Sequence, residues 1–313
     1  MKVIDLVKKQ RILSIEVIPP DRGKDIDEIF SAIDEIMEFS PSFINVTRHA
    51  PEIDYLEFGD RIIKVPKIKR PGTVGVSAAI KNRYNVDVVP HVLCLGMNKF
   101  EIEDMLIDLK YLEIENLFVI RGELENRKEM ASEKDGYNHA DELVAQISKM
   151  NKGIYLYPVE NPKSTNFCIG VAGYPEKHYE ALNLEEDLKY LKKKIDAGAD
   201  YVITQMFFDF EIYKNFVEKA REIGINVPII PGIKPIVQFK SMVRIPSTFF
   251  VTIPKEFASA MQEAKTPQEE FKTGTRYMSK LVDKLLNYGV PGIHIFTMGK
   301  GKSTKALLEA VYK

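Results

Sequence analysis

Eight short runs rich in β-branched and aromatic residues, separated by charged and amphipathic stretches, constrain the fold of this chain most. Most of the runs are apolar throughout, as expected of strands that are covered on both faces. Strands that alternate with helices in this way build parallel sheets from βα units. The pattern therefore predicts an α/β fold, a single (β/α)8 TIM-type barrel, with strands at residues 12–17, 43–47, 86–91, 117–120, 167–172, 201–204, 227–230 and 292–296.

One of the intervening stretches shows the helical pattern clearly. Leu184, Leu188, Leu191 and Ile195 recur at helical spacing, while charged residues occupy the remaining faces. No linker rich in Pro, Gly or Ser divides the 313 residues. Barrels of this length commonly form one unit, so we expect a single domain over residues 1–313.

The composition argues against several classes of protein. A net charge of -1 leaves no excess of basic residues for nucleic acid. Cys94 and Cys168 are too few for a disulfide framework or a four-cysteine metal site, and they fit a reducing compartment. The first residues carry charges where a signal peptide needs an apolar run, and no later run reaches membrane-spanning length. We therefore expect a cytoplasmic protein that binds neither nucleic acid nor membrane.

Two polar segments interrupt the βα pattern, at residues 124–138 after the fourth run and 152–166 before the fifth. Long loops in compact domains are usually functional or disordered. The first segment follows the carboxyl end of a strand, which is the catalytic side of a barrel. It is either part of the site or a solvent-exposed loop.

Glu16 is an ionisable residue near the end of the first apolar run, just ahead of Pro19 and Pro20. Burial at a strand end disfavours the charged carboxylate and keeps the group protonated nearer neutral pH, which a general acid needs. Two interpretations follow: Glu16 is a catalytic acid at the rim of the barrel, or it is a carboxylate paired with a neighbouring base.

Other polar groups follow the fourth and sixth runs. After the fourth come Arg121, Gly122 and Glu123, where the glycine lets a ligand approach the backbone and the arginine can bind an anion or a flat ring. The same triplet also occurs in ordinary turns. Gln205 lies at the end of the sixth run, where a polar side chain favours ligand contact over packing. Asp209 is predicted to cap the next helix.

Known metal and nucleotide motifs are missing. No i, i+4 pair or mixed cysteine spacing exists among the histidines at 49, 91, 139, 178 and 294, so we predict no metal site. His91 and His178 instead add polar groups at the rim. Residues 299–304 suggest a phosphate loop, but Phe296 stands where its first glycine is required. We expect a loop leading to an N-capped helix, with Lys300 near a ligand.

Taken in order, these pieces resemble the methylenetetrahydrofolate reductase family. Eight collinear pieces carry the resemblance: SIEVIPP (14–20), NVT (45–47), HVLC (91–94), RGE (121–123), AGYPE (172–176), DAGAD (196–200), TQMFFD (204–209) and IPGI (230–233). The resemblance implies a flavoprotein that uses FAD to pass a hydride from NAD(P)H to 5,10-methylenetetrahydrofolate by a ping-pong mechanism. The product is 5-methyltetrahydrofolate, which places the enzyme in one-carbon metabolism and methionine biosynthesis.

The resemblance also implies roles for particular residues. The family's first-strand glutamate donates the proton that opens the folate's five-membered ring, which gives an iminium that accepts hydride; this role falls on Glu16. Substrate contacts fall on Glu123, Gln205 and Lys300. The implied FAD contacts are Thr47, Arg48, Ala50, His91, Arg121, Gly122, Glu123, Ala140, Tyr174, His178, Ala181, Asp187, Lys193 and Lys194. The last two are either helix-surface lysines or contacts of the flavin pyrophosphate.

Several positions depart from the family pattern. Glu123 replaces an aspartate, which displaces the anion near the flavin by about one methylene. Arg48 and His49 replace Tyr-Gly, while Lys300 and Ser241 stand where an arginine and a glutamine are usual. The chain ends soon after the eighth unit, so we expect the short bacterial form, usually a homo-oligomer, without a regulatory domain.

Two other functions stay open at this point. One is a folate- or flavin-binding barrel that is reduced by a partner protein or ferredoxin rather than by NAD(P)H. The other is a barrel that binds these molecules without catalysis. The choice between NADH and NADPH does not follow from the sequence.

Overall fold

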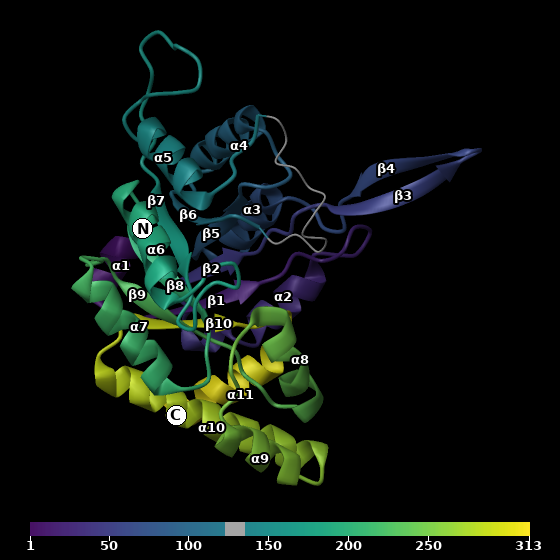
Figure 1. The fold of residues 1–313 in the computed structure, drawn as a ribbon, viewed down its shortest axis with the longest axis vertical. Helices are drawn as coiled ribbons and strands as arrows, with labels where there is room; N and C mark the ends of the chain where they lie inside the picture. Colours follow the sequence, from purple (N-terminus) through teal and green to yellow (C-terminus); the bar gives the residue numbers. More distant parts are fainter. Residues whose placement is uncertain (123–134) are drawn as a thin grey trace.

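Eight parallel strands close into a barrel, and the strands follow one another around it in chain order (Figure 1). The computed structural model describes residues 1–122 and 135–313. The predicted (β/α)8 barrel is therefore confirmed. Its strands are β1 (Ile12–Val17), β2 (Phe43–Val46), β5 (Asp87–Leu93), β6 (Asn116–Ile120), β7 (Cys168–Gly173), β8 (Tyr201–Met206), β9 (Ile229–Ile233) and β10 (Gly292–Phe296).

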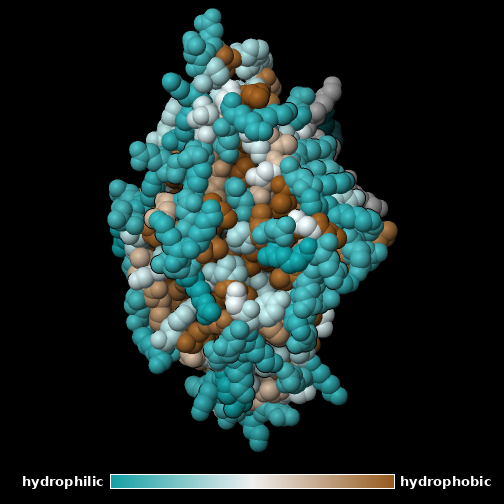
Figure 2. Space-filling model, turned by 90° about the vertical axis from the view of Figure 1, so that its left-hand side faces the viewer, coloured by the Kyte–Doolittle hydropathy of each residue, from teal (hydrophilic) through white to brown (hydrophobic). Residues whose placement is uncertain are grey.

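Helices cover the outside of the barrel, and their outer faces are charged. Along the side shown in Figure 2, hydrophilic residues cover most of the outline and apolar residues gather toward the middle. Within the described part of the chain, no helix is both long and apolar enough to cross a membrane. The helices are α1 (Val3–Lys9), α2 (Asp27–Asp34), η1 (Met37–Phe39), α3 (Thr73–Tyr84), α4 (Lys99–Tyr111), α5 (Ala140–Met150), α6 (Leu184–Asp196), α7 (Phe210–Glu222), α8 (Phe239–Phe249), α9 (Lys255–Glu263), α10 (Pro267–Tyr288) and α11 (Gly301–Tyr312).

The core has two layers, one inside the barrel and one between its strands and the helices. The inner layer holds nine buried residues near the amino ends of the strands, among them Ile12, Phe43 and Tyr201. Val3 of α1 belongs to the same cluster, so α1 packs against this end of the barrel. Because side chains fill the amino-terminal half, a ligand site has to lie at the carboxyl ends of the strands.

The predicted strands are present, but several continue beyond their predicted ends. β8 includes Gln205, β9 includes Gly232, and β5 extends past His91. Polar residues and glycines mark strand ends in sequence patterns, whereas here parallel pairing with both neighbours keeps the backbone extended. The polar side chains are thus held on the strands themselves, which positions them more rigidly than loops would.

The chain adds an antiparallel hairpin, β3 (Glu52–Phe58) and β4 (Arg61–Lys67), which the strand pattern did not predict. It projects from the barrel after β2 (Figure 1). The sequence does contain a local signal for the hairpin, because Gly59 and Asp60 form its two-residue connection, with Gly59 at φ 60°. Phe58 and Ile62 near its tip are 75% and 71% exposed. The hairpin therefore has the apolar composition of a core strand, but these residues are not buried.

Smaller predictions about helices and loops can also be checked. The amphipathic α6 is present and buries Leu188 and Leu191, and Asp209 caps α7 by accepting a hydrogen bond from the Glu211 amide at 3.0 Å. Segment 152–166 lies at the amino end of β7, where the buried Glu103 accepts a hydrogen bond from the Leu156 amide at 2.9 Å. Of segment 124–138, residues 124–134 lie outside the described part of the chain.

Candidate active site

A buried polar network crosses the mouth of the barrel around Glu16. Ser14 and Glu16 alternate with apolar residues on β1, and the register pairs Ser14 with His294 of β10 and Glu16 with Asn45 of β2. His91 joins them from β5. The residues Ser14, Asn45, His91 and His294 are at most 4% exposed. Because buried polar groups need partners, four neighbouring strands are tied together at this level.

Glu16 lies between two imidazoles. Its Oε2 atom is 3.4 Å from His91 Nε2 and 3.8 Å from His294 Nε2, so the second contact is electrostatic rather than a hydrogen bond. The outer partners extend the row: Ser14 Oγ lies 2.9 Å from His294 Nδ1, and Asn45 Nδ2 lies 3.3 Å from His91 Nε2. The carboxyl is 12% exposed, which leaves it open toward the mouth.

The protonation of Glu16 differs from the expectation. Burial makes the largest single contribution and raises the pKa of the Glu16 carboxyl, but the contacts with His294 and His91 together outweigh it, so the pKa is lowered. Burial also lowers the pKa of His91 to about 4. The ligand-free protein therefore holds a Glu16 carboxylate and a neutral His91 at neutral pH. The shift predicted from burial alone has the opposite direction because it left out the two histidines, whereas the alternative interpretation of a carboxylate beside a neighbouring base agrees with these contacts.

A second cluster lies beyond β6 and β7 and collects several predicted flavin contacts. The rings of Tyr174 and His178 meet edge to face with centroids 4.7 Å apart. The His178 amide donates to Asp187 Oδ2 at 3.1 Å, and burial raises the pKa of Asp187. Arg121 pairs with Glu180, which also lies 3.8 Å from His178 Nδ1. Residues predicted from separate motifs thus form one contiguous rim.

Lys194 adds a half-buried cation to the same rim. Its Nζ atom donates to the carbonyl oxygen of Ala172 at the end of β7, at 2.6 Å. Burial lowers the pKa of Lys194 to about 8, against the opposing attraction of Asp187. An ammonium that is this poorly solvated binds an incoming phosphate strongly, because little water has to be removed from it.

Unsatisfied polar atoms mark where this rim can receive a ligand. Among the described residues, the buried side-chain atoms without a hydrogen-bond partner include Arg121 Nε on this rim and Thr47 Oγ1 after β2, as well as Asn45 Oδ1 and His294 Nε2 in the network around Glu16. Gly122 adopts φ 97°, and a Cβ there would lie 3.0 Å from the Leu93 side chain, so backbone and space both favour glycine. Such atoms fit a polar group that arrives with a bound molecule. Glu123, the predicted acid beside the flavin, lies outside the described residues.

The side chains of other predicted flavin contacts do not reach this cluster. Arg48 turns toward α4, with its Nη1 atom 3.0 Å from Met105 Sδ. Lys193 is exposed on α6, with its Nζ atom 4.8 Å from the Tyr190 ring centroid. Three alanines contribute no polar side chain; Ala140 and Ala50 are half-buried, and Ala181 lies next to the cluster, its amide donating to His178 O at 3.0 Å.

Gln205 lies on β8, and Lys234 and Lys300 follow β9 and β10, the next strands around the barrel from this cluster. Gln205 is half-buried near the end of β8, and its Oε1 atom accepts a hydrogen bond from the Met206 amide at 2.9 Å. Lys234 directly follows β9. Burial and the charge of Lys300 lower its pKa to about 8, while the attraction of Glu16 opposes them. Lys300 itself is exposed just ahead of α11.

Sequence reasoning missed His294, Lys234 and Glu180 as site residues. The sequence did carry a signal for His294, because it is a polar residue in an otherwise apolar strand. Side chains alternate along a strand, so His294 lies on the same face as the two end residues of β10. Lys234 also had one, because a lysine follows an apolar strand directly. Glu180 follows no strand closely, and only the structure shows its pairing with Arg121.

Fold and site together define a (β/α)8 barrel with a polar, ligand-accessible mouth at the carboxyl ends of its strands, the arrangement of barrel enzymes. The sequence model of the family described as methylenetetrahydrofolate reductase matches residues 2–312. The chain belongs to this family, and the resemblance inferred from the motifs is confirmed.

Several relatives cover nearly the whole chain. It is 29% identical to "Methylenetetrahydrofolate reductase (NADH) 1" of Arabidopsis thaliana, over 98% of this chain and 50% of the relative. It is 28% identical to 5,10-methylenetetrahydrofolate reductase of Escherichia coli, over 96% of this chain and 90% of the relative. The chain thus spans about half the length of the plant relative and most of the bacterial one.

A solved structure shows the same fold. It belongs to a Clostridium thermocellum protein that binds two copies of 5-methyl-5,6,7,8-tetrahydrofolic acid, and it superposes with a TM-score of 0.58. The match covers 98% of this chain and 96% of the other, at 13% sequence identity. At that identity the likeness concerns the fold.

Proposed function

We propose that this protein is a methylenetetrahydrofolate reductase: an FAD-dependent enzyme that reduces 5,10-methylenetetrahydrofolate to 5-methyltetrahydrofolate with NAD(P)H, with Glu16 as proton donor. The observation that carries the proposal is the position of Glu16, an acid in a buried network that still opens to the mouth. Family membership supports the substrate. Relatives named for NADH in Arabidopsis and for NADPH in Caenorhabditis elegans support a nicotinamide donor of either kind.

The rim beyond β6 and β7 is where FAD would be held. Lys194 would bind its pyrophosphate, Thr47 and Arg121 would satisfy their buried unpaired atoms on it, and Tyr174 would pack against an aromatic part. Gly122 would allow close approach to the backbone. FAD supplies two-electron hydride chemistry, which no amino-acid side chain provides. The predicted contacts that this rim contains thus agree with the group that the family implies.

The chain's own chemistry is the handling of one proton at Glu16. A ring system that covers the mouth removes the remaining water contact of the carboxyl, and desolvation favours its neutral form. We therefore propose that Glu16 takes up a proton as the folate binds and donates it to the folate nitrogen that leaves when the ring opens. Neutral His91 can accept the hydrogen bond of the protonated carboxyl, and His294 contacts the carboxyl from the other side.

The decisive experiment separates the two half-reactions. The purified protein is loaded with FAD and mixed without oxygen with NADH or NADPH while the flavin absorbance is followed, and 5,10-methylenetetrahydrofolate is then added. We expect bleaching by at least one nicotinamide and recovery of the absorbance with folate. Flavin that is bound but reduced by neither donor would support the partner-protein or ferredoxin alternative. Failure to bind any flavin would contradict the proposal.

Lys194 gives a prediction about flavin binding. Because the pKa of Lys194 is lowered to about 8, this side chain is largely neutral at pH 9 in the ligand-free protein. A bound phosphate stabilises the ammonium and raises the pKa, so FAD binding at pH 9 is expected to take up close to one proton. Calorimetry in two buffers of different ionisation enthalpy measures this number. Lys194→Met should abolish the uptake.

Lys193→Met is the matched control, because Lys193 is the exposed neighbour on the same helix. It should keep the proton uptake of the unmodified protein. Equal uptake in Lys194→Met and the unmodified protein would remove Lys194 from the flavin site.

Lys234 gives a prediction about pH dependence. Glu16 raises the pKa of Lys234, and by the symmetry of the Coulomb interaction the ammonium lowers that of Glu16. Folate reduction needs protonated Glu16, so its rate falls as pH rises through the pKa of the complex. Removing the cation in Lys234→Met should move this falling limb to higher pH, as seen in kcat/KM against pH. Lys240→Met, at an exposed lysine of α8, should leave the limb in place.

A further inference from the structure

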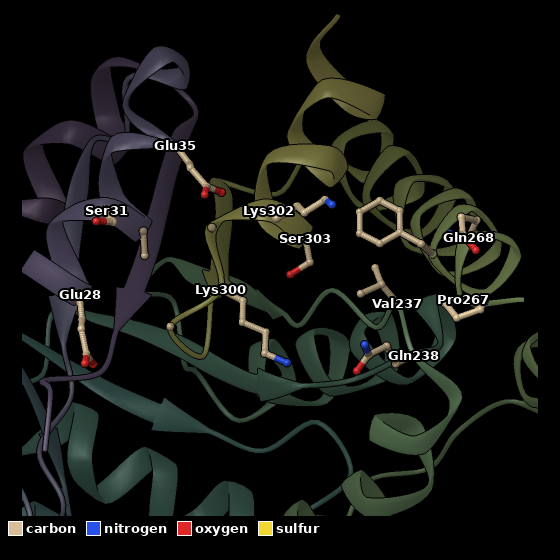
Figure 3. A pocket seen from close by; sticks show the side chains of 14 residues that line it. Glu28, Ser31, Glu35, Val237, Gln238, Pro267, Gln268, Lys300, Lys302 and Ser303 are labelled. Carbon is tan, nitrogen blue, oxygen red and sulfur yellow. The ribbon is translucent and has the colours of Figure 1, made fainter.

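A cavity of about 690 Å³ lies between α2, the loop after β9, α10 and the first turn of α11 (Figure 3). Lys300 extends into it, and no side chain caps α11, so the prediction that this helix is N-capped was wrong. A smaller cavity, which is lined by Val17 next to Glu16, shares Gly299 with it. The space therefore adjoins the mouth of the barrel. The hairpin of β3 and β4, in contrast, contains no predicted site residue.

The hairpin, residues 52–67, is anchored at its base and is called the arm below. At its start, Pro51 packs against Gly96, where an added Cβ would meet the proline ring. At its end, the carbonyl oxygen of Lys69 accepts a hydrogen bond from the Arg22 amide at 2.8 Å. Beyond these anchors the arm projects from the barrel (Figure 1).

Both faces of the arm carry exposed apolar residues. The register places Leu56, Phe58 and Ile63 on one face and Ile62 on the other, and these residues are 45% to 75% exposed. Together they expose on the order of 500 Å², a size at which surface patches often have a function. Within the described residues, the arm is a sheet of only two strands, and such a hairpin is at best marginally stable in water. The arm therefore requires a further surface to pack on.

The charges of the arm are divided between its strands. β3 contains Asp54 and Glu57 but no basic residue, and β4 contains Arg61 and Lys67 but no acidic one. Nucleic acid and anionic membranes bind surfaces with an excess of basic residues, which this mixture does not provide. A protein surface that presents both signs of charge fits better, and a second copy of this chain offers one.

A surface of matching character lies at the start of α4. Phe100 and Tyr157 stack with their ring centroids 5.0 Å apart, and they are 42% and 65% exposed. Val159, two residues further on, is 52% exposed. Lys99 and Glu101 flank Phe100 in the sequence, so that both signs of charge adjoin the aromatic pair. This receiving surface thus combines apolar rings with a cation and an anion.

The tip of the arm is complementary to the receiving surface. Asp60 and Arg61 lie there between Phe58 and Ile62, so an apolar contact can be flanked by two pairs of opposite charge. The arm points away from the α4 helix of its own chain (Figure 1), so the tip can meet this surface on another molecule. Arm and receiving surface together expose on the order of 800 Å² per copy, the area that a stable interface buries on each partner.

We propose that the arm is exchanged between two copies of this chain, with the tip of each arm packed on Phe100 and Tyr157 of the other copy. A twofold axis makes the two contacts identical, so each copy both gives an arm and receives one. Dimerisation of this kind does not depend on which reaction the barrel catalyses.

The first test is the molar mass of the FAD-loaded protein, measured by sedimentation velocity over a series of concentrations. We expect a dimer or an assembly of dimers. Phe58→Ser combined with Ile62→Ser should raise the dissociation constant of the dimer at least about 30-fold, the effect of losing one strong interface residue. Tyr190→Ser is the matched control, because Tyr190 is 55% exposed on α6, outside both surfaces, and its loss should leave the molar mass unchanged.

A protein that stays monomeric at every concentration would overturn the inference and leave the arm to another kind of partner. An assembly that the double serine variant leaves intact would also overturn it, because the copies would then meet through other surfaces. Circular dichroism of each variant checks that the barrel is folded.

The second test joins the two surfaces covalently. Ile62→Cys combined with Tyr157→Cys should give a disulfide-linked dimer on mild oxidation, because a disulfide requires Cα atoms within about 7 Å. Ile62→Cys alone should run as a single chain on a non-reducing gel, since Cys94 and Cys168 are both buried. Chains of the double cysteine variant that stay unlinked in a dimeric protein would place the arm elsewhere and contradict the inference.

Discussion

Glu16→Gln is expected to abolish folate reduction while flavin reduction by NAD(P)H stays at the rate of the unmodified enzyme. The amide keeps the size of the side chain but has no acidic proton to give to the folate nitrogen. General acids contribute roughly 10²- to 10⁴-fold to the rates of the steps that they serve, so the loss should exceed about 100-fold. Stopped-flow measurement of the two half-reactions, each followed through the flavin absorbance, separates them.

Glu16→Asp is the companion variant. It restores the acid but withdraws it by about one methylene from His91, which lies 3.4 Å from the native carboxyl. Partial recovery of folate reduction, with an altered pH profile, is therefore expected. An equal loss of both half-reactions in Glu16→Gln would show instead that Glu16 only maintains the shape of the mouth.

Among the variants described, Gly274→Ala is expected to lower the free energy of unfolding most. Gly274 is buried in α10, and a Cβ there would lie 1.9 Å from the carbonyl oxygen of Ile236. The clash is with backbone, so the helix and the loop after β9 must separate. Overpacking of this kind costs about 1–3 kcal/mol, and more where backbone has to move. Urea unfolding followed by circular dichroism measures the change in the free energy of unfolding.

Gly75→Ala is the matched control, because Gly75 is a helical glycine of α3 where an added Cβ would have no atom within 4 Å. There alanine should stabilise the protein by about 0.5–1 kcal/mol, because the unfolded chain loses conformational freedom. A neutral or stabilising effect of Gly274→Ala would show that α10 and the loop after β9 can move apart freely. The loop carries Val237 and Gln238, so such freedom would also widen the cavity beside α11.

The barrel could be predicted because its signal is local. Most of the strands are nearly continuous apolar runs, and parallel strands covered on both faces require that composition. Asp209 was predictable for the same reason, since its capping partner Glu211 is two positions away. The hairpin of β3 and β4 was missed because several of its apolar residues, among them Phe58 and Ile62, are exposed to solvent, where burial does not explain them.

The site was less predictable because its energetics are not local. Glu16 was found from its place at a strand end, but the direction of its pKa shift depends on His91 and His294, which belong to other strands. The pairing of Arg121 with Glu180 likewise joins separate loops. Composition and spacing indicate which groups reach the rim. Their protonation depends on distances between residues of different strands, which are fixed only in the closed barrel.

The meeting of β1 with β10 has a consequence for folding. Ser14 and His294 are 280 positions apart, and their contact forms across the seam where the first and last strands of the barrel pair. Contacts of such high sequence separation form late and slowly, because much chain entropy is lost before they become favourable. A nascent chain carries Glu16 from the start, but the carboxyl acquires its second imidazole only when this seam closes. The ionisation of a single acid is thus a reporter of the last topological step of folding.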